Sequence, residues 1–237
     1  MTEANDPAEI RTVAAFERFV LGQKPTPSSA YDTEYFTQNW RAGGNSYQLE
    51  TRRTMEGKNP ALIKEVFQPR RALDMGCGPG ALMYLLYELG VECDGVDVSP
   101  HSRELAPAEV RNRIALGRVS DPVKPNDSYD LVICREVFEH LTVLQVRQAV
   151  ANICRISSQY VYLTTRFHPQ PPSLLAYTTQ FDVDPTHITL LNKDFLRVLF
   201  VLEGFRSRPD LEARMDWLSK GRVLVMEKDP VIRELNR

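Results

Sequence analysis

The sequence predicts an α/β fold with a mostly parallel, doubly wound sheet and an additional N-terminal segment. Short apolar runs of strand length alternate with segments of helical spacing over residues 59–202. One run, 129–134, is rich in Leu, Val and Ile, which is typical of a strand buried on both faces of a parallel sheet. A glycine-rich turn, LDMGCGPG at 73–80, joins the first predicted strand directly to a helix.

The composition is that of an ordinary globular protein. The 237 residues are 43% hydrophobic and 25% charged, which fits one α/β domain with an elaboration. The formal net charge of -2 provides no global basic field, so we expect neither nucleic acid nor an anionic membrane as partner. With no membrane-spanning apolar run and no signal-peptide pattern, a cytoplasmic location is expected. The four cysteines form no CxxC pair, which predicts reduced thiols.

Residues 1–58 are expected to form an N-terminal cap or lid. A short helix is predicted over 10–21, where Val13, Phe16 and Val20 share one side, and a Pro-rich loop follows it. Aromatic residues then gather before the first strand. They can pack as a cap on the core or line a ligand pocket, and one lid can do both. The residues expected to contact an acceptor here are Tyr31, Tyr35, Trp40 and Tyr47.

The main domain is expected to cover residues 59–237. Asn59 and Pro60 predict a helix start, with Asn as the N-cap and Pro at the first helical position. A later helix is capped by Asn192 and closed by Gly204. The last two predicted strands are expected to be antiparallel, as a terminal hairpin. The predicted strands cover 71–74, 93–98, 113–119, 129–134, 159–165, 205–211 and 222–228.

A long irregular insertion, 166–191, carries four prolines. Loops of this length in a compact domain are usually functional or mobile. This one is expected to lie over the carboxyl edge of the sheet, where open α/β sheets bind ligands. Phe167 is expected to contact an acceptor, and His168 and His187 are the candidate general bases, because imidazole titrates near neutrality. His187 can alternatively brace the loop through a backbone hydrogen bond.

The remaining histidines are given structural roles. His101 is placed at the start of a surface helix, and His140 is expected to orient a loop. Two histidines in the insertion, with no acidic companion at ligand spacing, predict no metal site, although Asp182 and Asp184 leave that possibility open.

The glycine turn is followed by an acidic residue at the spacing typical of ribose-binding carboxylates. Asp97 stands about 20 positions after Gly78, where a carboxylate can accept both hydroxyls of an adenosine ribose. The dinucleotide fingerprint fails, because the third glycine, Gly80, comes one position too early. Pro79 removes a donor that a phosphate would use. A ligand with a ribose and a zwitterionic amino-acid tail fits better, with Asp74 holding the ammonium and backbone N–H groups meeting the carboxylate.

Four stretches resemble class I S-adenosylmethionine-dependent methyltransferases: LDMGCGPG, GVDVS, YDLVICREVFEHL and DPTHITLLNKDFLRVLFVLEGF. The similarity is closest to the small-molecule branch that includes the ubiquinone-pathway methyltransferases, and it covers residues 60–228. This resemblance implies S-adenosylmethionine as cofactor and a Rossmann-like, seven-stranded sheet whose final strand is reversed. The resemblance does not indicate which acceptor is methylated.

The resemblance also implies a set of cofactor-binding residues. Asp97 would hold the ribose, Val98 would pack on the adenine, and Ser120 and Asp121 would reach the adenine edge. Arg135 would line the cofactor near its sulfur, where it departs from the apolar residue often found in the family. A cation beside a sulfonium is unfavourable unless its head points away. The methionine part would be surrounded by Asp74, Gly76, Cys77, Gly78 and Gly80.

The predicted function is transfer of a methyl group to a small organic acceptor, with oxygen favoured, in a biosynthetic or natural-product pathway. The alternatives are methylation of carbon or nitrogen in a small molecule, and a non-catalytic scaffold that binds S-adenosylmethionine. Nucleobase methyltransferases of this fold carry an Asn/Asp-Pro-Pro-aromatic run after the fourth strand, and this chain has CREV at 134–137. The glycine spacing likewise disfavours a nicotinamide dehydrogenase.

Overall fold

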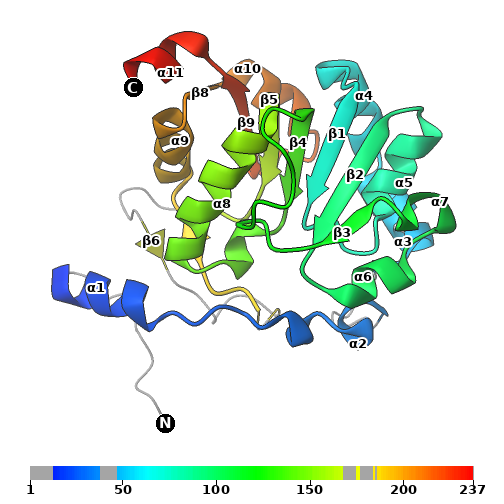
Figure 1. Ribbon diagram of the computed structural model, residues 1–237, viewed down its shortest axis with the longest axis horizontal. Helices are drawn as coiled ribbons and strands as arrows, with labels where there is room; N and C mark the ends of the chain where they lie inside the picture. Colours follow the sequence, from blue (N-terminus) through cyan, green and yellow to red (C-terminus); the bar gives the residue numbers. More distant parts are fainter. Residues whose placement is uncertain (1–12, 38–46, 168–174, 177–183, 185, 237) are drawn as a thin grey trace.

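A seven-stranded mixed sheet forms the centre of the protein (Figure 1). The strand order is β3-β2-β1-β4-β5-β9-β8; the first five of these run parallel, and β9 is antiparallel to both of its neighbours. This confirms the predicted sheet with its reversed final strand. The strands are β1 (Arg71–Met75), β2 (Glu92–Asp97), β3 (Ile114–Leu116), β4 (Tyr129–Arg135), β5 (Ser157–Thr164), β8 (Phe205–Ser207) and β9 (Val223–Lys228). The computed structural model describes residues 13–37, 47–167, 175–176, 184 and 186–236.

Helices cover both faces of the sheet, because successive residues of a buried strand point to opposite sides. Leu73 and Val132 pack in one apolar cluster with α8 and α9. Their chain neighbours Ala72 and Leu131 pack in the other cluster, with α4, α5 and α10. The helices of these two layers are α4 (Asn59–Phe67), α5 (Ala81–Glu88), α8 (Val143–Ile156), α9 (Lys193–Leu202) and α10 (Pro209–Met215).

The remaining elements are short and lie mostly around the edge of the sheet that carries the carboxyl ends of the parallel strands (Figure 1). No helix of the described ranges is both long and apolar enough to cross a membrane. These elements are α1 (Val13–Gly22), η2 (Ser28–Ala30), α2 (Thr33–Thr37), α3 (Leu49–Glu56), α6 (Pro100–Leu105), α7 (Ala108–Arg111), η3 (Phe138–His140), the strand pair β6 (Leu175–Ala176) and β7 (Leu190–Leu191), and α11 (Pro230–Leu235).

Three local predictions differ from the structure. The strand expected over 113–119 is limited to β3, Ile114–Leu116. Asn59 does not cap α4: it is the first residue of that helix, and its side chain bonds to Glu56 and Tyr162 instead. The strand expected over 205–211 ends at Ser207, since Pro209 occupies the first turn of a helix, where its missing N–H costs nothing. The helix cap at Asn192 is as predicted, with its Oδ1 accepting from the N–H groups of Asp194 and Phe195.

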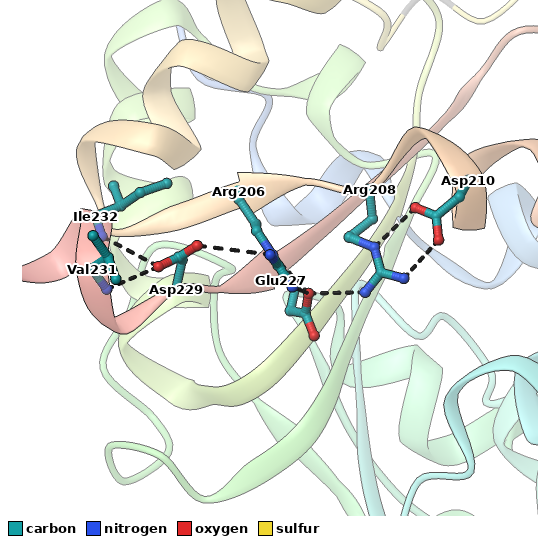
Figure 2. Close-up of polar contacts among 7 residues, drawn as sticks. All are labelled: Arg206, Arg208, Asp210, Glu227, Asp229, Val231 and Ile232. Atoms are coloured by element: carbon teal, nitrogen blue, oxygen red, sulfur yellow. Dashed lines mark hydrogen bonds and ion pairs between the residues drawn. The ribbon is translucent and has the colours of Figure 1, made fainter.

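Charged side chains line the β8 edge of the sheet (Figure 2). Glu227 on β9 accepts from Arg206 at 2.5 Å and from Arg208 at 2.9 Å, both across the antiparallel pair. Arg208 also donates twice to Asp210, at 2.9 and 2.6 Å, and this lowers the pKa of Asp210 to about 2. The Arg206–Glu227 and Arg208–Asp210 pairs are solvent-exposed, so each stabilises the fold little. Their charges do discourage another strand from pairing with the edge.

Candidate functional site

A cavity of about 490 Å³ lies at the carboxyl ends of the parallel strands. Its walls include the residues that follow β1, β2 and β4, which is where open α/β sheets bind their ligands. The expected cofactor-binding residues that line it are Asp74, Gly76, Cys77, Gly78, Asp97, Val98, Ser120 and Arg135.

The turn after β1 needs glycine for two separate reasons. Gly76 has a φ of +80°, in the region that side chains disfavour. A Cβ added there would also lie 2.3 Å from Cγ2 of Val137, on the segment that follows β4. The turn therefore packs directly under that segment, and any side chain at Gly76 would separate them.

The N–H groups of the turn already have protein acceptors. Gly76 and Cys77 donate to the carbonyl oxygen of Val96 at 2.7 and 3.2 Å, and Gly78 donates to Oδ2 of Asp97 at 2.8 Å. We expected turn N–H groups to meet the carboxylate of a ligand. In this structure these three N–H groups instead join the turn to the end of β2, so the turn contributes shape and holds Asp97 in place.

Asp97 lies at the end of β2 and is nearly buried, with 8% of its surface exposed. Its Oδ1 accepts from the N–H of Ser99 at 2.8 Å, while Oδ2 accepts from Gly78. Burial raises the pKa of this carboxyl even though these hydrogen bonds oppose the shift. Each oxygen has further lone pairs, so Asp97 can accept from two neighbouring hydroxyls, as a ribose would require.

Asp74 is a buried carboxyl in the wall of the cavity. Burial raises its pKa to about 7, while the positive charge of Arg135 acts in the opposite direction. A cationic group of a ligand placed beside Asp74 would favour the ionised form. This carboxyl therefore fits the ammonium of an amino-acid tail.

The positive charge of Arg135 is neutralised inside the protein. Its Nη1 lies 2.6 Å from Oε2 of Glu56, a residue of α3 that is 5% exposed. Asn59 donates to the same oxygen at 3.0 Å, and Tyr162 donates to Asn59 at 2.9 Å. Although burial opposes it, the positive charges of Arg135 and Arg52 lower the pKa of Glu56. The cation expected near the cofactor is therefore paired with a buried carboxylate.

Sequence reasoning missed this network. Glu56, Asn59 and Tyr162 line the cavity with Arg135, but Glu56 and Arg135 are separated by 79 positions. Nothing in the local pattern around Glu56 distinguishes it from the other charged residues of its short helix.

Aromatic residues of the N-terminal segment line the other side of the cavity. The rings of Tyr35 and Tyr47 stack at 5.6 Å, and Tyr31 meets Tyr35 edge-on at 5.1 Å. The hydroxyl of Tyr35 donates to Oδ2 of Asp184 at 3.3 Å. All four residues are in the cavity wall, so these tyrosines are placed to act as a lining as well as a cap.

Three residues singled out from the sequence are not part of the cavity wall. Phe167 packs against the core, with Nζ of Lys193 5.6 Å from its ring centre. The carboxylate of Asp121 accepts from the N–H of Arg118 at 2.9 Å, which closes a local turn. Gly80 precedes the first turn of α5. The candidates that fall outside the described residues are Trp40, His168 and Asp182.

Two histidines from distant segments meet in the cavity wall. The rings of His140 and His187 are 4.6 Å apart, edge to face. His187 Nε2 lies 3.5 Å from Oδ2 of Asp184, and His140 Nδ1 lies 2.9 Å from Oγ1 of Thr186. Burial, followed by the neighbouring His187, lowers the pKa of His140 to about 4, so its imidazole is neutral at physiological pH.

Glu139 joins these histidines. One ligand atom from each of Glu139, His140 and His187 lies within 4.8 Å of the others, an arrangement that could hold a metal ion. The sequence argument about metals considered acidic partners only within the insertion. The adjacent pair Glu139-His140, on a different segment, was the available signal.

A family model described as a methyltransferase domain matches residues 47–208. The chain belongs to the methyltransferase-domain family. No curated protein matches the chain.

Solved structures share the fold of this methyltransferase. The PH0226 protein from Pyrococcus horikoshii OT3 aligns with a TM-score of 0.56 at 18% identity, over 86% of this chain and 100% of that one. A SAM-dependent methyltransferase from Archaeoglobus fulgidus aligns with a TM-score of 0.53 at 18% identity, over 75% and 99%. The glycopeptide N-methyltransferase MtfA, solved with S-adenosylmethionine, aligns with a TM-score of 0.52 at 18% identity, over 73% and 94%.

S-adenosylmethionine is the methyl donor of this enzyme. The donor supplies an activated methyl group, so the protein has mainly to bind and align it. The residues present fit it: the Asp97 carboxylate for the two ribose hydroxyls, and the buried Asp74 carboxyl for the ammonium. Because Arg135 is paired with Glu56, it does not add an uncompensated cation to the cavity wall.

Proposed function

We propose that this methyltransferase transfers the methyl group to a hydroxyl oxygen of a small organic acceptor, as a cytoplasmic enzyme of a biosynthetic or natural-product pathway. The observation that carries the proposal is the continuity of the cavity. A single space joins the Asp74 and Asp97 side to a recess lined by His140 and His187.

The recess suits an enclosed organic molecule. Tyrosine rings form one wall, and the Arg135–Glu56 network forms another. Aromatic walls with a few placed polar groups are typical of small-molecule sites. A folded nucleic acid would need an open, basic approach, and the chain as a whole is slightly acidic.

Residues 1–58 act in this proposal as a cap that completes the acceptor side. Gln23 ties that segment to the main domain: its Oε1 accepts from the N–H of Val143 at 2.8 Å, and its Nε2 donates to Oγ1 of Thr189 at 2.9 Å. Thr189 follows His187 closely, so the same contact supports the histidine side of the cavity. The insertion 166–191 of the main domain contributes its described residues Asp184 and His187 to the acceptor side in this proposal.

We assign to His187 the removal of the proton from the acceptor hydroxyl. An oxygen acceptor is a weak nucleophile until its proton is removed, and a neutral imidazole can take that proton. Asp184, 3.5 Å from Nε2 of His187, can orient the ring and stabilise its charged form. Loss of such a group typically costs about 10²-fold to 10⁴-fold in rate.

A nitrogen acceptor is the second candidate. MtfA, which shares the fold, is an N-methyltransferase. A neutral amine already carries the electron pair that attacks, so this reaction needs no base. If nitrogen is the acceptor, His187→Ala will leave the rate nearly unchanged above the pKa of the amine.

The test is a panel of small molecules in matched sets, each differing only in an acceptor hydroxyl, amine or thiol. The enzyme is incubated with isotopically labelled S-adenosylmethionine, and products are identified by mass spectrometry. We expect label only on hydroxyl members and a rate loss of about 10²-fold or more in His187→Ala. His101→Ala, a histidine on α6 outside the cavity wall, is the matched control. Labelled amines with unlabelled alcohols would contradict the proposal.

A further inference from the structure

Backbone hydrogen bonds join Glu139 of η3 to the segment that follows His187. The carbonyl oxygen of Glu139 accepts from the N–H of Ile188 at 2.8 Å and from that of Thr189 at 3.1 Å. These bonds hold His187 against Glu139 and His140. The three side chains therefore meet because two separate segments are bonded at this point.

Glu139 carries an oxygen that has no partner. The residue is 1% exposed; Oε2 accepts from Oγ1 of Thr165 at 2.7 Å, and Oε1 has no hydrogen bond within the described part of the chain. Glu136 adds a second negative charge nearby, and its backbone has a φ of +52°. Buried polar atoms in native proteins nearly always have partners, so Oε1 of Glu139 is an open position that a proton or a cation can satisfy.

The hydrogen bonds around His140 favour the tautomer that can bind a cation. The hydroxyl of Thr186 donates its one proton to Oδ1 of Asp184 at 2.6 Å. Its oxygen must then accept from Nδ1 of His140, 2.9 Å away. The Nδ1 atom of His140 thus carries the hydrogen and Nε2 carries the lone pair. A histidine ligand normally donates its other N–H to an oxygen in this way.

We propose that Glu139, His140 and His187 bind a divalent first-row transition-metal cation at the wall of the cavity. The donors are two imidazole nitrogens and one carboxylate oxygen, and their ligand atoms lie within 4.8 Å of one another. Such a set suits Zn²⁺, Mn²⁺ or Fe²⁺, with further positions left for water or substrate. The cation also supplies the positive charge that Oε1 of Glu139 lacks.

The role of the cation rests on the proposed function. His140 and His187 line the cavity, so a cation held by them can take the acceptor hydroxyl as a further ligand. Binding lowers the pKa of that hydroxyl, which loses its proton to solvent. The oxygen–carbon bond then forms as the carbon–sulfur bond breaks, and the electron pair of the broken bond stays on sulfur. With the cation bound, His187 is a ligand, and the cation performs the activation otherwise assigned to the imidazole.

Binding is measured first, without methyl donor or acceptor. Full-length protein is stripped with a chelator and dialysed, then titrated with Mn²⁺ and with Zn²⁺ by calorimetry. We expect one cation per chain, and affinity weakened by about 10-fold or more in His140→Ala, His187→Ala and Glu139→Gln. The control His101→Ala keeps wild-type affinity. Equal binding by wild type and the three variants, or no binding by wild type, would overturn the inference. Urea unfolding of each variant confirms that it is folded.

Activity separates this inference from the proposed function. If wild type binds the cation and the three variants do not, the site stands even where no methylated hydroxyl is found. If stripped protein methylates a hydroxyl at the full rate and added Mn²⁺ or Zn²⁺ changes nothing, the proposed function stands and the catalytic role of the cation is refuted.

Discussion

Replacing Gly76 with alanine tests how the glycine turn is held under the segment after β4. Alanine at a φ of +80° costs about 1–2 kcal/mol from backbone strain. The added Cβ would lie 2.3 Å from Cγ2 of Val137, far inside contact distance, and overpacking of that kind costs about 1–3 kcal/mol. We therefore expect Gly76→Ala to lower the free energy of unfolding by about 2–5 kcal/mol.

The molecule provides a matched control in Gly90. Its φ is +77°, nearly that of Gly76, but a Cβ there meets nothing within 4 Å. Gly90→Ala should therefore show the strain of about 1–2 kcal/mol without the collision. The difference between the two variants isolates the contact with Val137.

The assay is urea unfolding followed by far-ultraviolet circular dichroism, with S-adenosylmethionine affinity measured on the folded variants. Removing Cγ2 in Val137→Ala should restore about 1–3 kcal/mol to Gly76→Ala, as a positive coupling in the double-mutant cycle. If Gly76→Ala is no less stable than Gly90→Ala, or if the two mutations are simply additive, the packing argument fails.

Three further predictions concern the charged groups of the cavity. Asp97→Asn should weaken S-adenosylmethionine binding by about 10-fold to 100-fold, since it loses charged hydrogen bonds worth about 1.5–3 kcal/mol; calorimetry showing unchanged affinity would exclude the ribose role. Arg135→Ala should cost up to about 3–5 kcal/mol of unfolding free energy, because buried Glu56 then keeps only Asn59 and a 3.9 Å contact with Arg52, and adding Glu56→Gln should recover part of it. Asp74, whose pKa is raised to about 7, must ionise to bind an ammonium, so affinity should rise about 8-fold from pH 6 to 7.5. The same shift predicts that Asp74 contributes less to the stability of the apo-protein as the pH rises from about 4, its pKa in the unfolded chain, towards 7, its pKa in the folded protein. Asp74→Asn should flatten the pH dependence of binding, and a wild-type affinity that falls with pH would contradict this assignment.

The amino-acid sequence by itself determined the fold of this methyltransferase and its methyl donor. Strand, glycine turn and helix are contiguous, and Asp97 follows the turn at a spacing fixed by one intervening helix. Local periodicity and turn chemistry encode such elements, so they can be recognised without knowing what packs against them. The end of the strand predicted at 205–211 was misplaced because Pro209 fits equally a strand boundary or a helix start.

The tertiary structure alone decided which distant residues meet in the wall of the cavity. Glu56 neutralises Arg135 across 79 positions, and His187 meets Glu139 because backbone bonds from Ile188 and Thr189 bring two distant segments together. Asn59 shows the same effect at one residue. Its side chain could cap a helix, but it forms hydrogen bonds with Glu56 and Tyr162 instead. Contacts of this kind arise from packing between elements, which leaves no period or motif in the chain. Their energy is gained only after the sheet and its helices have assembled.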